Sequence, residues 1–241
     1  IHKMNPSKKN LVIFDFDQTI THFDSLFEQF PLLKDEKESE RLKAMDAVGN
    51  YVDTFNTFYE LAHNKKISIE QINEVLKNLK LTKGMKELFD FLKNHKEKFE
   101  VIVISSNFAY AIEKVLEYNN MRDIVSMIYC NPYKMLPNGK IEVIQRDHHD
   151  CKDCNPCQCK SKELKIYLEE NKREYYNNLY FIADGGNDLC LAKNLGKNDV
   201  VFPRKDFNLY KKVIQPEIKK ILSCKVEPWS DAEEIINYLN K

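Results

Sequence analysis

Short apolar runs alternate with amphipathic stretches along most of this chain. The apolar runs are rich in β-branched and aromatic residues and predict buried strands at residues 11–16, 100–105, 126–132, 178–184 and 199–203. Apolar residues at helical spacing predict helices at 84–95, 108–120, 161–172 and 231–239, and another that opens at Asn187. Because strands that alternate with helices require a mostly parallel sheet with right-handed crossovers, the pattern predicts a doubly wound α/β core.

Residues 21–81 interrupt this alternation. Their apolar residues recur at helical spacing, as in YVDTFNTFYELA and ISIEQINEVLKNL, with little strand character. We therefore expect a helical cap inserted after the first strand, with the core formed by residues 1–20 and 82–241. Within the core, Asn138 and Gly139 stand between two extended runs, which predicts a hairpin with a type I′ turn.

Composition and charge restrict the class of protein. A chain of 241 residues is long enough for one buried core and a smaller accessory unit. Its 37 basic and 37 acidic residues cancel without forming a basic stripe, which argues against nucleic acid as a partner. No apolar run approaches the roughly 20 residues of a membrane span, and the polar first residues lack the apolar core of a signal peptide. We expect a cytoplasmic protein with a small-molecule ligand; its oligomeric state is left open.

Reactive side chains follow the predicted strands. Asp15 and Asp17 end the first strand, Ser105 ends the second, and Asp184 opens a DGGND turn that closes at Asp188. The carboxyl ends of parallel strands meet at one edge of a sheet, so these groups should converge there. One carboxylate can then attack phosphorus while another transfers protons. Hard Mg²⁺ prefers oxygen ligands, and the three aspartates at 15, 184 and 188 suit it.

A cation and a hydroxyl complete this predicted phosphate site. The hydroxyl of Ser105 can hold a phosphoryl oxygen, and Lys160 or Lys162, just ahead of a helix, can steady the transferring group. Each residue alone has a simpler explanation, since a serine often caps a helix and Asp188 suits a helix's first turn. Their joint occurrence, each group in order along the chain, favours catalysis.

The motifs DFDQT, VISS, CK and DGGND resemble, in this order, the four motifs of the haloacid-dehalogenase superfamily. More narrowly, HDCKDCNPCQCK, IADGGNDLC, VVFPRKDF and VEPW resemble the phosphoethanolamine/phosphocholine phosphatase family, which includes pyridoxal phosphate phosphatase. The resemblance implies a Mg²⁺-dependent phosphatase that hydrolyses a small phosphomonoester through an aspartyl phosphate on Asp15. It makes Asp17 the general acid and base, whose backbone carbonyl also faces Mg²⁺. The implied phosphate-binding residues are Thr19, Ser105, Ser106 and Lys160, the last directly after the final cysteine; the other implied Mg²⁺ ligands are Asp184 and Asp188.

The substrate headgroup is less sharply specified. Family members that act on phosphocholine or phosphoethanolamine carry acids at two positions that are here His22 and Ser106, and Asp24 lies close enough to compensate in part. Pyridoxal phosphate and thiamine monophosphate therefore compete as substrates. A phosphotransferase that passes phosphate to an alcohol is a rival enzyme, and a zinc-bearing interaction module without catalysis is a rival from another class.

Four of the seven cysteines crowd into residues 151–159. Without a secretory signal, a C-x₂-C spacing indicates a metal site rather than a disulfide framework. We expect a structural, tetrahedral Zn²⁺ in a loop at about 147–160, where it would hold the segment that delivers Lys160. The expected ligands are His149, Cys151, Cys154 and Cys159, with Cys157 as an alternative to His149 and His148 as a weaker candidate.

Overall fold

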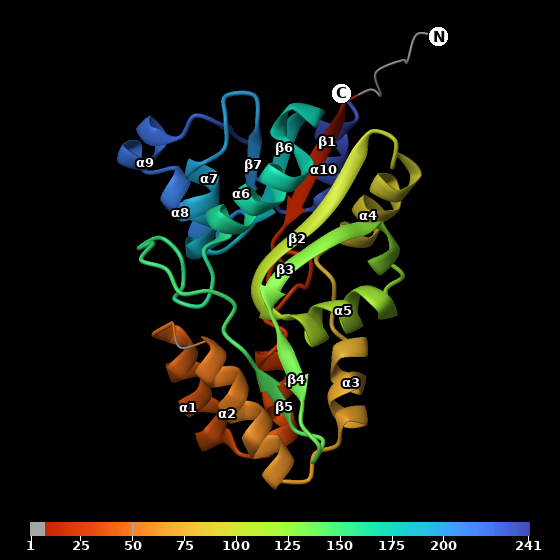
Figure 1. The fold of residues 1–241 in the computed structure, drawn as a ribbon, viewed down its shortest axis with the longest axis vertical. Helices are drawn as coiled ribbons and strands as arrows, with labels where there is room; N and C mark the ends of the chain where they lie inside the picture. Colours follow the sequence, from red (N-terminus) through yellow and green to blue (C-terminus); the bar gives the residue numbers. More distant parts are fainter. Residues whose placement is uncertain (1–7, 50) are drawn as a thin grey trace.

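Strand β1 lies near the centre of a parallel sheet, drawn in red in Figure 1. The computed structural model describes residues 8–49 and 51–241, and within these ranges the main sheet has six strands in the order β3-β2-β1-β6-β7-β8. Every neighbouring pair is parallel, as predicted. The strands are β1 (Lys9–Phe14), β2 (Phe99–Phe108), β3 (Val125–Asn131), β6 (Tyr176–Ala183), β7 (Val200–Pro203) and β8 (Lys225–Val226).

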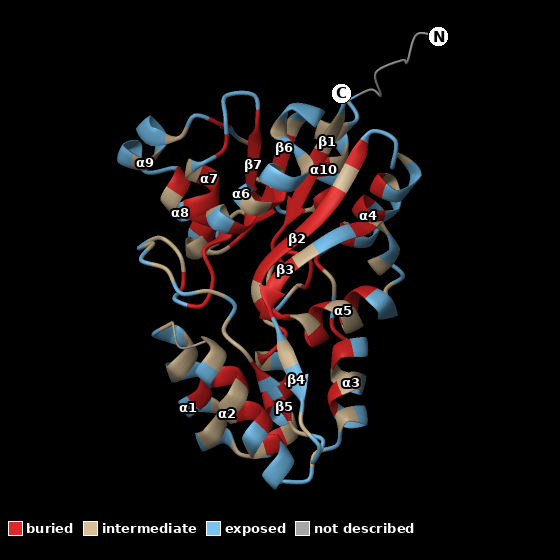
Figure 2. Ribbon diagram, in the orientation of Figure 1, coloured by how far each residue is buried: buried red, intermediate tan, exposed pale blue. Residues whose placement is uncertain are grey.

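Both faces of the sheet are covered by helices. Alternate side chains of a strand point to opposite faces, so Leu11 and Ile13 pack into one apolar cluster and Val12 and Phe14 into another. The first cluster includes α6 (Lys160–Asn171), α7 (Leu189–Lys193) and α8 (Asn208–Val213). The second includes α4 (Met85–Asn94), α5 (Ala109–Tyr118) and α10 (Ala232–Leu239). Strands β1, β2, β6 and β7 are accordingly buried along most of their length (Figure 2), and the doubly wound α/β fold is confirmed.

The insert after β1 is helical, as the sequence predicts. It contains η1 (Phe27–Leu33), α1 (Glu36–Ala47), α2 (Tyr51–Asn64) and α3 (Ile69–Lys77), which lie beyond one end of the sheet (Figure 1). The chain enters and leaves it at one point, where Thr21 and Leu81 form an antiparallel bridge. There the hydroxyl of Thr82 donates to the carbonyl of Thr21 at 3.0 Å. This paired neck joins the insert to the sheet.

The predicted hairpin forms but packs against the insert. Strands β4 (Tyr133–Met135) and β5 (Ile141–Val143) lie beside α2, where the side chain of Asn56 bonds both backbone groups of Val143 at 2.9 and 2.7 Å. The type I′ prediction is wrong, because that turn needs positive φ at both central residues and only Gly139 has it (φ +83°). Residues 137–139 instead form a three-residue loop closed by a bond from Leu136 N to Lys140 O.

Several short elements escaped the sequence prediction. Strand β8 has two residues, and α8 and α9 (Pro216–Ile221) have six each, too few for a hydrophobic period to emerge. The remaining single turns are η2 (Arg122–Ile124), η3 (Arg173–Tyr175) and η4 (Gly186–Asp188). None of the helices in the described ranges is long and apolar enough to cross a membrane.

Candidate active site

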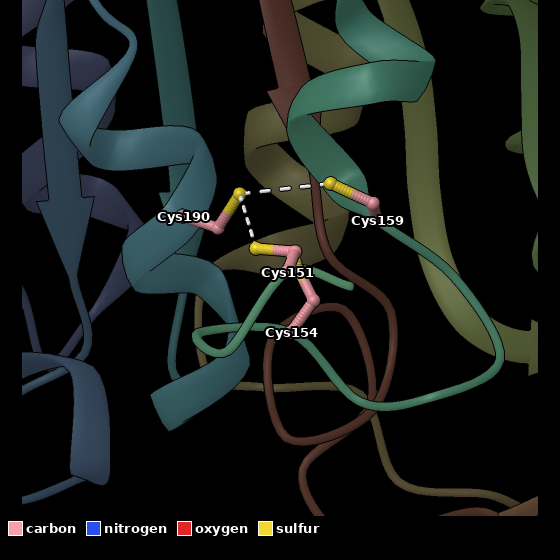
Figure 3. A group of neighbouring side chains, drawn as sticks. All are labelled: Cys151, Cys154, Cys159 and Cys190. Atoms are coloured by element: carbon pink, nitrogen blue, oxygen red, sulfur yellow. Dashed lines mark hydrogen bonds between the residues drawn. The ribbon is translucent and has the colours of Figure 1, made fainter. Parts of the chain in front are cut away.

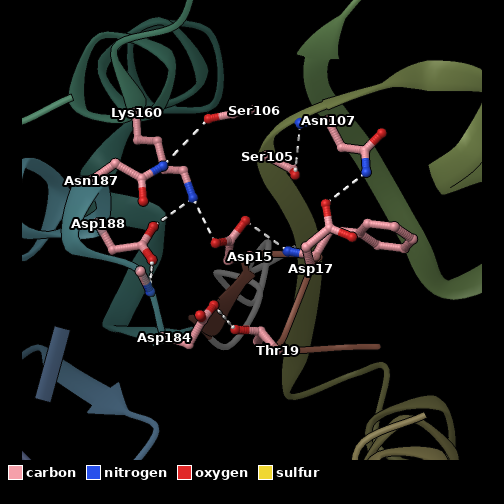
Figure 4. Close-up of polar contacts among 12 residues, drawn as sticks. Asp15, Asp17, Thr19, Ser105, Ser106, Asn107, Lys160, Asp184, Asn187 and Asp188 are labelled. Atoms are coloured by element: carbon pink, nitrogen blue, oxygen red, sulfur yellow. Dashed lines mark hydrogen bonds and ion pairs between the residues drawn. The ribbon is translucent and has the colours of Figure 1, made fainter. Parts of the chain in front are cut away.

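The carboxyl ends of β1 and β6 lie side by side, at the point where the strand order reverses. Such switch points open a crevice at the sheet edge. Asp15 follows β1 and Asp184 follows β6, and Asp188 ends the single turn η4 that comes next. All three side chains are buried, and one carboxylate oxygen from each lies within 4.8 Å of the others (Figure 4). The structure thus brings together the three aspartates predicted from the sequence.

Lys160 supplies the cation of this group. Its Nζ lies 2.9 Å from Asp15 Oδ2 and 2.5 Å from Asp188 Oδ1, and the side chain is 1% exposed. Burial opposes a charge there, but the two carboxylates outweigh it and raise the pKa of Lys160. Lys162, the alternative candidate, is half-exposed and pairs with Asp147 at 2.6 Å. Lys160 is therefore the lysine at the site.

The aspartates carry more negative charge than one lysine balances. Burial first, and then the charges of Asp15 and Asp188, raise the pKa of Asp184 well above its usual value. Burial and the charge of Asp15 likewise raise the pKa of Asp188 to about 7. Buried carboxylates that repel one another are stabilised by a divalent cation, and their oxygens are the ligands that Mg²⁺ prefers. The donor set fits a magnesium ion.

Asp17 faces away from this group. Its Oδ1 accepts a hydrogen bond from Ser25 N at 2.8 Å, and its Oδ2 accepts one from Asn107 Nδ2 at 2.6 Å. Burial raises its pKa, which favours the protonated form that a general acid needs. Sequence reasoning missed Asn107, although a polar residue two positions after Ser105 in an apolar strand was an available signal. Asn107 Nδ2 also donates to the hydroxyl of Ser25 at 2.8 Å, so it holds both Asp17 and the serine that donates to Asp17.

A cavity of about 250 Å³ opens beside Asp15 and Asp17. Ser105 and Ser106 line it, as a phosphate-binding role requires. The hydroxyl of Ser105 accepts from Asn107 N at 3.1 Å, and that of Ser106 accepts from Asn155 Nδ2 at 2.8 Å. The remaining lining residues come from both the sheet edge and the insert: Gln18, Asp24, Leu26, Asp46, Tyr51, Phe55, Asn107, Asn155, Asp184, Gly185, Gly186, Asn187 and Asn208.

Two predicted site residues lie elsewhere. Thr19 is fully buried outside the cavity lining, and its hydroxyl donates to Asp184 Oδ1 at 2.9 Å, so it positions a carboxylate rather than a phosphate. His22 also lies outside the lining, because its Nδ1 faces the guanidinium of Arg204 at 3.2 Å. Arg204 donates to the carbonyl of Gln18 as well and so supports the loop after β1. Of the two predicted headgroup residues, only Asp24 reaches the cavity.

The backbone of both turns at the site contributes to its geometry. Gln18 adopts φ +56°, a left-handed conformation that costs energy for a residue with a side chain and recurs at functional sites. Gly185 N donates to Asp188 Oδ2 at 2.7 Å, which orients that carboxylate.

The cysteine cluster differs from the predicted one in its fourth member. Cys151, Cys154, Cys159 and Cys190 converge (Figure 3), with all four sulfur atoms within 4.8 Å of one another. Hydrogen bonding with Cys154 is the main cause that lowers the pKa of Cys190 to about 5. Cys190 comes from α7, remote in sequence from the other three. It stands two residues after the DGGND motif, and that position was the signal available for it.

The other predicted zinc ligands lie outside this cluster. His149 uses both ring nitrogens locally: Nε2 lies 2.9 Å from Asn155 O, and Nδ1 accepts from Cys151 N at 3.1 Å. Cys157 is buried against the side chain of Asn131, 3.6 Å from its Nδ2. His148 Nδ1 lies 3.0 Å from Gln145. Cys190 therefore occupies the place in the cluster where the sequence put His149, because the loop turns the imidazole of His149 toward its own backbone.

The chain resembles known proteins over almost its whole length. Residues 10–241 match the family model described as "Putative Phosphatase". The chain belongs to this phosphatase family. The phosphatase is similar to the bovine pyridoxal phosphate phosphatase PHOSPHO2, with 29% identity over 96% of this chain and 97% of that protein. It is also similar to the chicken phosphoethanolamine/phosphocholine phosphatase, with 28% identity over 97% of this chain and 88% of that protein.

Solved structures show the same fold. A phospho-aspartyl intermediate analogue of phosphoserine phosphatase matches with a TM-score of 0.60 and 22% identity, covering 96% of this chain and 99% of that one. Substrate-bound phosphoserine phosphatase matches with a TM-score of 0.61 and 20% identity over the same shares. These structures confirm the predicted α/β fold. The family model and the curated relatives confirm the prediction of a phosphoric monoester hydrolase, and the non-catalytic module is set aside.

Proposed function

We propose that Asp15 is the nucleophile of this phosphatase and that Asp17 transfers protons. The observation that carries the proposal is the convergence of Asp15, Asp184 and Asp188 around Lys160, at the edge of a cavity into which Asp17 also faces. A cavity of about 250 Å³ suits a small phosphomonoester. The predicted roles of Ser105 and Ser106 in phosphate binding belong to the same proposal.

The carboxylate oxygens of the aspartate group suit magnesium. We propose that the carboxylates of Asp15, Asp184 and Asp188, with the backbone carbonyl of Asp17, would hold the ion. When bound, Mg²⁺ would neutralise the negative charge that otherwise keeps a phosphate dianion from approaching a carboxylate nucleophile. Lys160 adds a fixed positive charge at Asp15 Oδ2.

The proposed reaction has two displacements at phosphorus. First, a carboxylate oxygen of Asp15 bonds to phosphorus while the bond to the alcohol oxygen breaks, and protonated Asp17 gives its proton to that oxygen. Asp17 is then a carboxylate and takes a proton from water, whose oxygen bonds to phosphorus as the bond to Asp15 breaks. Inorganic phosphate leaves and Asp15 is regenerated. The contacts with Ser25 and Asn107 would hold Asp17 in place through both steps.

We propose that residues 21–81, together with the hairpin of residues 133–143, form the cap of this site. Asp24, Leu26, Asp46, Tyr51 and Phe55 from the insert line the same cavity as Asp15. A cap that closes over the sheet edge would exclude bulk water while phosphate is transferred. It must then admit the one water that hydrolysis consumes.

The lining favours a substrate with a cationic headgroup. Asp24 and Asp46 face the cavity beside Tyr51 and Phe55, and the described lining contains no lysine or arginine. Burial, and then the charge of Asp17, raises the pKa of Asp24 and raises that of Asp46 to about 6. A ligand cation would offset the repulsion among these carboxylates. Carboxylates next to aromatic rings suit an amine or quaternary ammonium group. Phosphocholine and phosphoethanolamine carry an aliphatic ammonium and thiamine monophosphate carries a cationic thiazolium, whereas pyridoxal phosphate has neither group.

The roles of the two aspartates are tested by amide variants. With Mg²⁺ and a generic aryl phosphate, Asp15→Asn should abolish phosphate release, and Asp17→Asn should reduce it by roughly 10²- to 10⁴-fold. Circular dichroism should show both variants folded. Near-normal rates in either variant would contradict the assignment. Added acceptor alcohols that yield phosphorylated alcohol in place of phosphate would identify a phosphotransferase.

The headgroup proposal is tested with a matched pair of substrates. Phosphocholine and its neutral isostere 3,3-dimethylbutyl phosphate differ in charge and hardly in shape. We expect kcat/KM to favour phosphocholine by on the order of tenfold or more, equivalent to about 1.4 kcal/mol, and Asp46→Asn to reduce that preference. Equal kcat/KM values for the two substrates in the wild-type enzyme would contradict the preference for a cationic headgroup. They would leave the proposed phosphatase mechanism unaffected.

A further inference from the structure

The cysteine cluster has no part in the proposed reaction. None of its four thiols lines the cavity in the described part of the chain. Cys151 and Cys154 lie on the long loop between β5 and α6, Cys159 immediately precedes α6, and Cys190 lies in α7 (Figure 3). Two segments that are remote in sequence, the loop before α6 and the helix α7, therefore contribute sulfur to one point.

The spacing of the sulfur atoms matches a tetrahedral metal site. Cys190 Sγ lies 3.5 Å from Cys151 Sγ and 3.7 Å from Cys159 Sγ. Four sulfurs around zinc at roughly 2.3 Å are about 3.8 Å apart, whereas a disulfide needs about 2.05 Å. Four thiols that approach one another this closely, without any pair at bonding distance, fit a shared ion better than two disulfides.

Hydrogen-bonding groups lie close to the sulfur atoms of the cluster. Cys190 Sγ lies 2.9 Å from the hydroxyl of Ser161, which is itself held by Asn194 at 3.0 Å. Such outer contacts orient metal ligands. The first turn of the twelve-residue helix α6 faces the cluster. Its backbone N–H groups have no carbonyl partner within the helix and can donate to a thiolate. The donors to Cys154, Cys159 and Cys190 are the backbone N–H groups of Lys160, Lys162 and Ser161, respectively.

We propose that Cys151, Cys154, Cys159 and Cys190 bind one Zn²⁺ ion, and that this ion positions the charged pair at the active site. All four positions of a tetrahedral ion are then protein sulfurs, so the site is structural and has no place for substrate or water. Cys159 directly precedes Lys160, and Cys190 follows Asp188 by two residues. A metal that ties Cys159 to Cys190 thus fixes both partners of the contact between Lys160 and Asp188.

The metal site is tested by zinc content, which does not depend on catalysis. Protein purified after expression with zinc should carry one zinc per chain, and Cys190→Ser should lose it. His149→Ala and Cys157→Ser are matched controls, since their side chains lie outside the cluster, and both should keep the metal. Cobalt substituted for zinc should give the charge-transfer and d–d bands of a tetrahedral tetrathiolate site, unchanged in His149→Ala.

Two results would overturn this assignment. One is a wild-type protein without zinc in which mass spectrometry after thiol labelling finds a disulfide between Cys151 and Cys190. The other is loss of zinc in His149→Ala with retention in Cys190→Ser, which would restore the ligand set first expected from the sequence.

The positioning role has its own test. Cys190→His offers a nitrogen ligand in place of sulfur, whereas Cys190→Ser does not bind zinc well. At a temperature where circular dichroism shows both variants folded, we expect Cys190→Ser to lower kcat by about 10- to 100-fold and Cys190→His to recover zinc and most of kcat together. A folded Cys190→Ser protein that lacks zinc yet keeps wild-type kcat would refute the positioning role.

Discussion

At the scale of single residues, the cavity is dominated by acids held close together. Asp46, near the end of α1, lies on the cap side of the cavity, away from the aspartates that fit Mg²⁺. Burial first and the charge of Asp17 second raise its pKa to about 6. A carboxyl whose pKa is higher in the folded state than in the unfolded state makes folding less favourable once it ionises. The insert therefore carries an electrostatic cost at neutral pH.

We predict that Asp46→Asn stabilises the protein at high pH and not at low pH. The unfolded-state pKa is about 3.9, so both states are protonated below about pH 4 and the group has no effect there. As pH rises toward 6, the unfolded state ionises first and stability falls; above about pH 6 the cost is complete. Because Asp46 is partly exposed, we expect about 1 kcal/mol at about pH 8. Urea unfolding at both pH values measures the difference.

A matched control separates this effect from a general change in charge. Asp53→Asn removes the same charge from an exposed position of α2. A gain in the free energy of unfolding that is the same for both variants, or the same at both pH values for Asp46→Asn, would contradict the prediction.

At the scale of elements, the hairpin β4–β5 depends on a helix for its stability. Each of its strands has three residues, and an isolated two-stranded hairpin is marginal in water. Asn56 in α2 bonds both the N–H and the C=O of Val143, as a further strand would. The loop that carries Cys151 and Cys154 begins just after this hairpin. The attachment of the hairpin to α2 therefore also fixes the position at which that loop starts.

We predict that Asn56→Ala loosens the hairpin. The substitution leaves two backbone groups of Val143 without partners and should lower the free energy of unfolding by about 1–3 kcal/mol. Amide hydrogen exchange should accelerate in residues 133–143 more than in β1 or β2. Lys134→Ala, at an exposed position of β4, is the control and should leave exchange unchanged. Equal protection of the hairpin in the Asn56 variant would show that other contacts hold it.

At the scale of the whole molecule, the buried aspartates link metal binding to stability. Asp15, Asp184 and Asp188 come together only in the folded chain, because Asp15 follows β1 whereas the other two follow β6. A ligand that binds the folded state and not the unfolded one raises the free energy of unfolding by mass action. Mg²⁺ should therefore stabilise the fold as well as support the chemistry.

We predict that removal of Mg²⁺ lowers the midpoint of thermal unfolding. At a concentration of about 100 times Kd, the ion should contribute about 2.7 kcal/mol. Asp184→Asn removes one ligand and should lose most of this gain, and scanning calorimetry with and without chelator measures it. An unfolding midpoint that Mg²⁺ leaves unchanged in the wild-type protein, or raises equally in the variant, would argue against a site at these aspartates.

Much of this arrangement was predictable because it depends on local sequence. Buried parallel strands must be apolar, so runs such as LVIFDF identified the strands, and acids directly after them marked the sheet edge. Asp15 and Asp184 were identified in this way, and the helical period of residues 21–81 identified the insert. In each case the physical cause lies within a few residues of the feature itself.

Tertiary structure decided which way side chains point and what they meet. Thr19 turned to Asp184 and His22 to Arg204, because partners brought near by folding offered better hydrogen bonds than the cavity did. Cys190 joined the thiol cluster across the fold, while His149 bonded its own loop. Asn107 in β2 and Asp46 in α1 also line the cavity. The hydrophobic periodicity of these elements does not predict which of their polar side chains face a common cavity. Contacts between distant segments depend on the packing of the whole chain, so the sequence determined the elements and the chemistry, and the fold determined the partners.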